Sequence, residues 1–465
     1  MRMRVSAWPK KRGRESRTYG ISRRMSETGK TRKTQIVVVG GGAAGLELAT
    51  RLGAHFGRRH FDIILVEKNR THIWKPLLHE VAAGSLDANL DEVGYRSHGY
   101  AWGYRFFYGA MEGVDRDNRQ VLIAPIRDED GREIMGRHGI RYDYLVLALG
   151  SVSNDFGTKG VAQNCIFLDS RLQADRFRSK LLDHCLRVSR TLQANPDADA
   201  VVRVDIVGGG ATGVELAAEL YNAAAELRHY GLEVFDETRL KVALIEAGPR
   251  ILPALPEKLS QAAHKELEAL GVRILTGEQV VEATAEGMLT RSGELLKADL
   301  SVWAAGVRGP DMLARLGLEI SGNNQLTVRP TLQTTRDERI FAIGDCAFFV
   351  PEGASRPLPP RAQAAHQMAA VAFHNIEALI RGKPLKRFVY HDHGSLVSLS
   401  RFSTVGSLMG NLIGGRMAIE GRLARFVYVS LYRMHLIAIH GWIKGLALIL
   451  LGHVNRIIRP RLKLH

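Results

Sequence analysis

Gln35-Ile-Val-Val-Val-Gly-Gly-Gly-Ala-Ala-Gly45 carries the strongest structural signal in this chain of 465 residues. Its apolar half is typical of a buried strand, and its second half opens a helical stretch. The spacing of the glycines is G-x-G-x-x-G, formed by Gly40, Gly42 and Gly45. A further apolar run ends in the acidic residue Glu67, 22 residues beyond Gly45. This order predicts a βαβ unit that binds a dinucleotide, with the pyrophosphate at the helix N-terminus and the ribose hydroxyls on Glu67.

The same pattern occurs a second time. Val204-Asp-Ile-Val207 is expected to be a strand, and it leads into Gly208, Gly210 and Gly213 and then a helix. The next strand ends in Glu246, 33 residues beyond Gly213. An acid at that place accepts the ribose hydroxyls and repels a 2′-phosphate, so the second unit favours NADH over NADPH. Arg250, four residues later, argues mildly against this preference.

Other strand ends support a duplicated architecture. The buried strand over 144–149 ends at Gly150, the strand over 300–305 ends at Gly306, and a third ends in Gly344-Asp345. We therefore expect an α/β fold with two Rossmann-like dinucleotide-binding domains. Glu215, just inside the second helix, would face the nicotinamide, although a helix N-terminus also favours an acid for its dipole alone.

With four motifs in this order, residues 34–400 resemble the two-dinucleotide-binding-domain flavoprotein superfamily. The resemblance implies FAD on the first unit, which the NADH unit interrupts, and an aspartate, here Asp345, that holds the ribityl chain of the flavin. The residues expected to contact the two cofactors are Gly40, Gly42, Ala43, Ala44, Gly45, Glu67, Lys68, Gly150, Gly344, Asp345 and Ala362 for FAD, and Gly208, Gly210, Gly213, Glu246 and Gly306 for NADH.

Two short motifs narrow the resemblance. Disulfide reductases carry a redox cysteine pair soon after the first acidic strand end, and residues 72–80 contain no cysteine, which excludes that branch. Instead, Trp74-Lys-Pro-Leu-Leu78 resembles the corresponding segment of the type II, non-proton-pumping NADH:quinone oxidoreductases. Arg361-Ala-Gln-Ala-Ala-His-Gln367 matches the AQxAxQ quinone-site motif of that family. An amide at Gln363 can donate to a quinone carbonyl, and Gln367 shares its helix face. His366 is left open as either a proton donor or a solvent-facing residue.

Charge is concentrated at the two ends of the chain. Residues 1–33 contain 12 Lys and Arg with 2 acids, and residues 416–465 contain 9 with 1, so the ends account for +18 of a net charge of +16. The body between them is close to neutral, which argues against a nucleic-acid groove. Residues 1–33 lack the apolar core of a secretory signal. We expect them to be a disordered extension, or an upstream addition if Met25 is the true start.

The apolar C-terminal segment predicts attachment to a membrane surface. Its longest uncharged stretch, between Arg433 and Lys444, is shorter than the roughly 20 residues that a span requires. On a helical wheel Arg422, Arg433, His440 and Lys444 lie on one basic face opposite an apolar face, which is typical of a helix that lies in the interface. Gly441 and Gly445 are expected to divide this helix.

The expected organisation has five parts: an extension over 1–33, the FAD domain over 34–160 and 323–415, the NADH domain over 161–322, and a membrane-association segment over 416–465. Together with the resemblance, this organisation predicts a peripheral membrane enzyme that contains FAD. We expect it to pass electrons from NADH to a membrane quinone without pumping protons, and to be a homodimer on the cytoplasmic face of the inner (plasma) membrane. No metal is expected. Two alternatives stay open: a sulfide:quinone oxidoreductase that uses Cys165 and Cys346, and a flavoprotein like apoptosis-inducing factor.

Overall fold

The computed structural model describes residues 32–232, 234–392, 394–399, 403–410, 415–420, 432–458 and 462. The first strand, β1, begins at Thr34, where the dinucleotide-binding pattern was expected to begin. The predicted extension over 1–33 lies outside these residues except for its last two, and so does the part of the C-terminal segment over 421–431.

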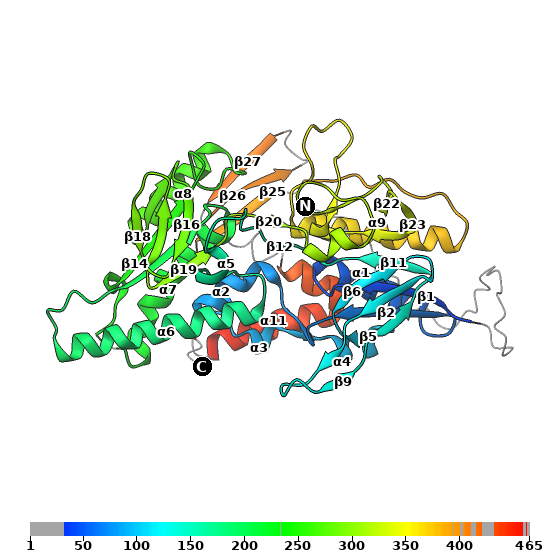
Figure 1. The fold of residues 1–465 in the computed structure, drawn as a ribbon, viewed down its shortest axis with the longest axis horizontal. Helices are drawn as coiled ribbons and strands as arrows, with labels where there is room; N and C mark the ends of the chain where they lie inside the picture. The colour runs from blue at the N-terminus through cyan, green and yellow to red at the C-terminus, as the bar shows by residue number, and fades with distance from the viewer. Residues whose placement is uncertain are drawn as a thin grey trace.

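Two parallel sheets form the centres of two units that lie beside each other (Figure 1). The first sheet has the order β22-β23-β11-β1-β2-β5, in which every neighbouring pair is parallel except β22 and β23. The second sheet has the order β15-β14-β13-β19 and is parallel throughout. The prediction of two Rossmann-like units is confirmed. The strands are β1 Thr34–Val39, β2 Phe61–Glu67, β5 Arg105–Tyr108, β11 Tyr144–Leu147, β22 Gln333–Thr334 and β23 Asp337–Ala342 in the first unit, and β13 Val202–Val207, β14 Leu240–Glu246, β15 Arg273–Thr276 and β19 Leu300–Trp303 in the second.

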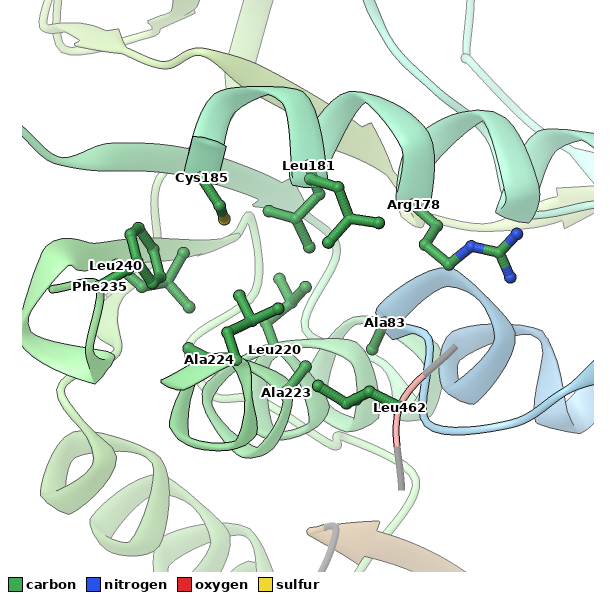
Figure 2. Close-up of a pocket in the computed structure, with 12 residues that line it drawn as sticks. Ala83, Arg178, Leu181, Cys185, Leu220, Ala223, Ala224, Phe235, Leu240 and Leu462 are labelled. Carbon is green, nitrogen blue, oxygen red and sulfur yellow. The ribbon is translucent and has the colours of Figure 1, made fainter. Parts of the chain in front are cut away.

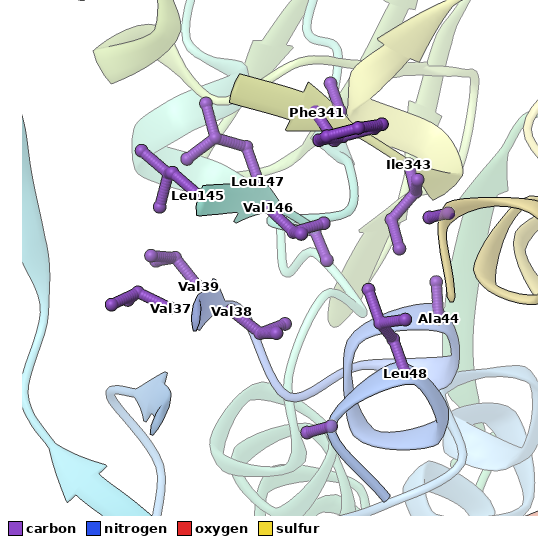
Figure 3. Close-up of a cluster of buried hydrophobic side chains, with 14 of the residues drawn as sticks. Val37, Val38, Val39, Ala44, Leu48, Leu145, Val146, Leu147, Phe341 and Ile343 are labelled. Carbon is purple, nitrogen blue, oxygen red and sulfur yellow. The ribbon is translucent and has the colours of Figure 1, made fainter. Parts of the chain in front are cut away.

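The apolar runs became strands because parallel sheets are covered on both faces and need apolar side chains on both. Figure 3 shows this in the first unit, where Val38 of β1, Val146 of β11 and Phe341 of β23 lie in one core together with Leu48 of helix α1. Since β23 follows the whole second unit in sequence, the chain returns to the first sheet after building the second.

Helices cover the sheets, and the antiparallel pair of β12 and β20 links the two units (Figure 1). Strand β12, Val152–Ser153, leaves the first unit and pairs with β20, Val307–Arg308, at the return from the second. The helices are α1 Ala43–Phe56, α2 Leu78–Ala83, α3 Ala88–Asp91, α4 Tyr95–Trp102, α5 Val161–Asn164, α6 Arg171–Ala194, α7 Ala211–Leu227, α8 Glu257–Leu270, α9 Ala362–Ile380 and α11 Trp442–Ile458. The smaller sheets contain β6 Met111–Asp115, β7 Gln120–Ile123, β10 His138–Arg141, β16 Val280–Thr284, β17 Gly287–Thr290, β18 Leu295–Lys297, β25 Gly394–Leu399, β26 Ser403–Gly410 and β27 Gly415–Glu420.

The C-terminal segment differs from its helical-wheel prediction in two respects. Gly441, at φ 75°, separates the helix over 432–440 from α11 as expected, but α11 continues through Gly445. The helix over 432–440 packs into the first unit, with Ile439 fully buried, and His440 lies against His98 instead of on an exposed basic face. Among the described residues, no helix is both long and apolar enough to cross a membrane.

A small apolar hollow lies between α2, α6 and α7 (Figure 2). Leu181 and Cys185 of α6 and Leu220 of α7 line it, and Leu462 enters it from the C-terminal end of the chain. Its lining contains none of the predicted site residues. We interpret it as a feature of the packing of the second unit.

Candidate functional site

The first glycine loop shows two kinds of requirement for glycine. Gly40 and Gly45 are packed against backbone of the chain itself. A Cβ on Gly40, which has φ 101°, would lie 2.3 Å from the carbonyl oxygen of Ala148, and a Cβ on Gly45 would lie 1.9 Å from the carbonyl oxygen of Gly40. Gly42 is different, because a Cβ there would meet nothing within 4 Å. Gly42 is also the N-cap of α1, and no side chain caps that helix. Open space in front of an uncapped helix N-terminus fits a pyrophosphate.

The second loop repeats this arrangement. Gly208 has φ 113°, and a Cβ on it would lie 2.5 Å from the carbonyl oxygen of Ala304. A Cβ on Gly213 would lie 2.1 Å from the carbonyl oxygen of Gly208, whereas one on Gly210 would meet nothing within 4 Å. Gly210 begins α7 without a side-chain cap. The two loops are therefore built alike and leave the same space open.

Both acidic strand ends lie against their glycine loops. Glu67 accepts a hydrogen bond from the backbone N–H of Gly41 (2.7 Å), and Glu246 accepts one from Gly209 (2.7 Å). These carboxylates are held beside the loops, where the ribose of a dinucleotide would lie. Lys68 is exposed next to the first carboxylate.

The guanidinium of Arg250, whose position in the sequence mildly favoured NADPH, is occupied by hydrogen bonds to the backbone. Its guanidinium donates to the carbonyl oxygens of Leu252, Pro253 and Leu255 at 2.9 to 3.3 Å. An arginine held by three backbone carbonyls is not placed to bind a 2′-phosphate. The geometry of the second site thus favours the unphosphorylated nucleotide.

Asp345 lies just after β23, and a neighbouring serine supports its side chain. Its carboxylate accepts a hydrogen bond from the Ser151 hydroxyl (2.9 Å), and burial raises the pKa of its carboxyl group against the opposing effects of this bond and of Lys75. Lys75 donates to the carbonyl oxygen of Ser151 (3.0 Å). Gly150 precedes this serine at φ 67°, with open space where a side chain would be. The strand ends of β11 and β23 therefore bring Gly150 and Asp345 close together through Ser151.

The start of α9 meets the start of α1 at Gly344. A Cβ on Gly344 would lie 3.6 Å from that of Ala365 and 3.7 Å from that of Ala44, so these small residues converge. Gly344 has φ 73°, a backbone conformation that favours glycine. Ala362 is the first residue of α9, which has no side-chain cap. The quinone-motif helix thus begins beside the first nucleotide loop.

The two motif glutamines lie on one face of α9, as expected, and both contact the segment that follows the helix. The Gln363 amide donates to the Asp392 carboxylate (3.2 Å). Gln367 donates to the carbonyl oxygen of His391 (2.8 Å) and accepts from its N–H (2.9 Å). Asp392 also pairs with Arg361 (3.4 Å). The orientation of Gln363 is therefore set by a neighbouring ion pair.

His366 points to another helix. Its Nδ1 contacts the carboxylate of Glu47, a side chain of α1 that is fully buried and also pairs with Arg51 (2.6 Å). Burial lowers the pKa of His366, but Glu47 outweighs it, and the pKa lies above its usual value. The sequence left open whether His366 is a proton donor or a solvent-facing residue. In the structure its imidazole is half-exposed and favours the charged form.

Glu215 is held between the two units. It lies on the second turn of α7, is almost fully buried, and its Oε2 lies 3.5 Å from Nδ1 of His79 on α2. Gly306, just after the neighbouring strand β19, has φ 149°, and a Cβ added there would lie 2.9 Å from the ring of Phe156. The structure therefore places Glu215 and Gly306 at the carboxyl edge of the second sheet, near the second glycine loop.

The cysteines do not form a redox pair in the described chain. All three are free and buried, and Cys165 and Cys346 belong to separate apolar clusters. Burial raises the pKa of Cys165 to about 12 and that of Cys346 to about 11. Thiols that stay protonated are poor nucleophiles, which argues against the sulfide:quinone alternative.

Several supporting residues escaped the sequence analysis. Gly41, inside the first loop, accepts hydrogen bonds through its carbonyl oxygen from Tyr95 Oη (2.7 Å) and His72 Nδ1 (2.9 Å). His72 Nε2 lies 3.0 Å from Nε2 of His435 on the C-terminal helix, and burial lowers the pKa of His72 to about 4. A neutral His72 that donates through Nδ1 must accept through Nε2, so His435 is the donor of that bond. In the sequence, the one indication that histidines support the site was their position, because His72 and His79 flank Trp74-Lys-Pro-Leu-Leu78.

Comparisons with known proteins agree with this geometry. The family model described as pyridine nucleotide-disulphide oxidoreductase matches residues 34–369. A type II NADH:quinone oxidoreductase of Haemophilus influenzae is 48% identical over 442 residues, which cover 92% of this chain and 99% of the relative. One from Staphylococcus aureus is 30% identical over 393 residues, 83% of this chain and 92% of the relative.

Solved structures show the same fold. NDH2 from Plasmodium falciparum in complex with NADH superposes with a TM-score of 0.77 at 19% identity, covering 93% of this chain and all (100%) of that chain. The sulfide:quinone oxidoreductase of Aquifex aeolicus superposes with a TM-score of 0.65 at 19% identity, covering 91% and 95%. At such identities the likeness extends to the fold alone.

Proposed function

Because this chain belongs to the type II NADH:quinone oxidoreductases, within the pyridine nucleotide-disulphide oxidoreductase family, and transfers electrons from NADH to a quinone, we propose that its two glycine loops bind different cofactors. The first loop holds FAD and the second holds NADH. The observation that carries this proposal is the matching open space in front of Gly42 and Gly210, each at an uncapped helix N-terminus.

For FAD, the proposed contacts surround the open edge of the first sheet. The N–H groups at Ala43, Ala44 and Gly45 would face the pyrophosphate, and Glu67, next to Lys68, would accept the ribose hydroxyls. Asp345, supported by Ser151, would accept from the ribityl hydroxyls. Gly40, Gly42, Gly150, Gly344 and Ala362 leave room for close approach. Bound FAD would accept the hydride of NADH and deliver two electrons to the quinone.

For NADH, Gly208, Gly210 and Gly213 form the pyrophosphate loop and Glu246 accepts the ribose hydroxyls. Glu215 and Gly306 lie at the nicotinamide end. A carboxylate beside the nicotinamide orients its carboxamide and favours the positive charge that develops as the hydride leaves. The preference for NADH over NADPH follows from Glu246 and from the committed Arg250.

The quinone is proposed to bind at the start of α9. The Gln363 amide, steered by Asp392, would donate to a quinone carbonyl, and Gln367 fixes the 391–392 segment beside it. Neutral amides keep such a pocket compatible with a lipid-soluble substrate. His366 lies on the Glu47 side of the same helix.

Attachment to a membrane surface is proposed for α11. The large apolar residues of this helix that are more than half exposed are Trp442, Ile443, Leu446, Leu450 and Leu451, at 53% to 88%. An exposed apolar helix with a lysine among them, Lys444, suits the interface with anionic lipid. We also propose domain boundaries at 34–160, 161–322, 323–415 and 416–465, and a location on the cytoplasmic face of the inner membrane. The protein is proposed to be a homodimer, and sedimentation will test this oligomeric state.

The test uses glycine substitutions that the structure separates. Gly42→Leu fills the first open space and should lower the FAD content of the purified protein, whereas Gly210→Leu should preserve FAD and raise the KM for NADH on the order of tenfold. Gly322→Leu, at an exposed glycine whose Cβ would also meet nothing within 4 Å, is the matched control and should change neither. Loss of FAD in the Gly210 variant, with retained FAD and a raised KM for NADH in the Gly42 variant, would reverse the assignment.

A further inference from the structure

His366 lies between the quinone motif and the first nucleotide-binding helix. It comes three residues after Gln363 on α9, and side chains at that spacing are neighbours on a helix, about 5 to 6 Å apart between their Cβ atoms. Its Nδ1 atom contacts the carboxylate of Glu47 on α1, and its side chain is 43% exposed. A substrate that the Gln363 amide holds at the start of α9 is therefore within reach of the imidazole.

Glu47 determines which ring nitrogen of His366 is free. The Glu47 side chain is fully buried, and its Oε1 atom pairs with the Arg51 guanidinium (2.6 Å), which keeps the carboxylate ionised and able only to accept hydrogen bonds. The Nδ1 atom of His366 must therefore carry a hydrogen, which it donates to the other carboxylate oxygen, Oε2. Within the part of the chain that the structure describes, Nε2 has no hydrogen-bond partner. Nε2 is thus the ring atom that can give up or take a proton.

The C-terminal helix over 432–440 approaches the same side of α9. His435 lies close enough to His366 that the charge of His366, together with the larger effect of burial, lowers the pKa of His435. The helix that follows, α11, carries the exposed apolar residues that are proposed to meet the lipid. A quinone that arrives from the membrane along this C-terminal segment would therefore reach the side of α9 that holds His366.

We propose that His366 is a catalytic acid that donates the Nε2 proton to a quinone oxygen, and that Glu47 is the positioning residue that holds the imidazole for this step. The inference rests on the proposed place of the quinone at the start of α9. Reduction of a quinone to a quinol takes two electrons and two protons. The hydride of NADH supplies both electrons and one proton. The Nε2–H bond of the imidazolium breaks to supply the second proton, and the neutral imidazole then takes a proton back from water.

The surroundings of the ring favour the charged form that this step needs. Burial lowers the pKa of His366, but the carboxylate of Glu47 outweighs burial and raises the pKa above its usual value, against the opposing effect of Arg51. The titratable groups that face His366 are Glu47 and Arg51 of α1 and His435 of the C-terminal helix. Since Glu47 carries the negative charge in this group, loss of that charge should lower the pKa of His366.

The experiment uses two electron acceptors that differ in their need for protons. The FAD-loaded full chain is reduced with NADH, and its reoxidation is followed by stopped flow with a short-tailed ubiquinone analogue or with ferricyanide, which takes electrons without protons. His366→Gln should slow reoxidation by the quinone on the order of a hundredfold at pH 7, the usual effect of removing a general acid, and leave reoxidation by ferricyanide within about twofold. The quinone rate of the parent should fall as pH rises and the imidazolium loses its proton, and the variant should lack this decline.

Glu47→Gln tests the positioning role. It should move the decline of the quinone rate to lower pH, and it should lower the pKa of His366 in an NMR titration of the ring, whose signals are identified by their loss in His366→Gln. The matched control is His55→Gln, because Nε2 of His55 on α1 lies 2.9 Å from Oε1 of Glu377 on α9, so that this change removes an equivalent contact between the same two helices. It should leave both rates and the pH profile unchanged. Because His366 is half-exposed, its variant tests the acid even where the Glu47 variant does not fold.

The outcomes separate this inference from the proposed function. Equal slowing of the quinone and ferricyanide reactions by His366→Gln would overturn the inference, and so would a quinone rate within twofold of the parent or an unchanged pH profile in the Glu47→Gln variant. A parent-like quinone rate in Gln363→Ala would instead show that the proposed quinone site is wrong. A defect in Gln363→Ala beside a normal His366→Gln variant would overturn the role of His366 alone.

Discussion

Asp205 makes the stability of the second unit depend on pH. It lies on β13, three residues before Gly208, and is 3% exposed; within the described chain its Oδ2 has no hydrogen-bond partner. Burial raises the pKa of its carboxyl group from 3.8 to about 7, against the opposing pull of Arg273. The folded chain therefore binds this proton more tightly than the unfolded chain. At about 1.4 kcal/mol per pKa unit, the difference is about 4 kcal/mol.

The sign of the effect follows from the raised pKa. The stabilisation is fully present below the unfolded pKa, near pH 4, declines as pH rises, and is lost once pH passes the folded pKa, near 7. Asp205→Asn removes this titration. Urea unfolding followed by circular dichroism at pH 5, 6, 7 and 8 should show the variant gaining on the parent by up to about 1.4 kcal/mol per pH unit, with a plateau above pH 7.

A matched control is Asp117→Asn, which changes an exposed aspartate. It should shift the free energy of unfolding by less than about 0.5 kcal/mol at every pH. A gap between the Asp205 variant and the parent that stays constant from pH 5 to 8 would refute the reasoning, because it would mean that Asp205 carries the same charge in both states.

Three further predictions concern the site and the C-terminal segment. Glu246→Arg should lower the ratio of kcat/KM for NADH over NADPH on the order of tenfold, and an unchanged ratio would argue against a nicotinamide nucleotide at this loop. Gln363→Ala should slow reoxidation of the flavin by quinone on the order of tenfold while flavin reduction by NADH stays within twofold in stopped flow; a defect confined to reduction would place the quinone elsewhere. A chain that ends at Gly441 should leave the membrane fraction and retain FAD. A chain that ends at Gly421 should do the same, and its free energy of unfolding in urea should also fall by about 2 kcal/mol or more, because the buried Ile439 is removed. Equal stability of the two truncated chains would show that the helix over 432–440 adds nothing to the first unit.

The sequence predicted the parallel sheets and the glycine loops because those features are local. A strand, a turn that needs φ above zero and a following helix occupy consecutive residues, so Gly40 and Gly208 could be recognised without knowledge of the fold. The repeat of the pattern then identified the second unit. Even the face shared by Gln363 and Gln367 needed only the period of a helix.

What the sequence did not predict depends on residues that are far apart along the chain. Glu47 contacts His366 across 319 positions, and His72 contacts His435 across 363. Neither pairing leaves a periodic trace, because each involves one side chain on each segment. The C-terminal helix shows the same limit: a helical wheel treats His435 as polar, but a neutral histidine with a buried partner packs inside.

One short segment explains why the parts of the molecule should respond together. His72 supports the first glycine loop and meets His435 of the C-terminal helix, Lys75 supports the serine that holds Asp345, and His79 reaches Glu215. These contacts come from eight consecutive residues, which the strand β3, Thr71–His72, fixes at one end and α2 fixes at the other. A substitution that shifts this backbone must therefore disturb FAD retention, NADH oxidation and the seating of the C-terminal helix at once. A substitution at Gly42 or Gly210, where an added Cβ would meet nothing within 4 Å, leaves this segment in place and should affect one cofactor alone. The pattern of defects therefore distinguishes a local change from a displaced segment.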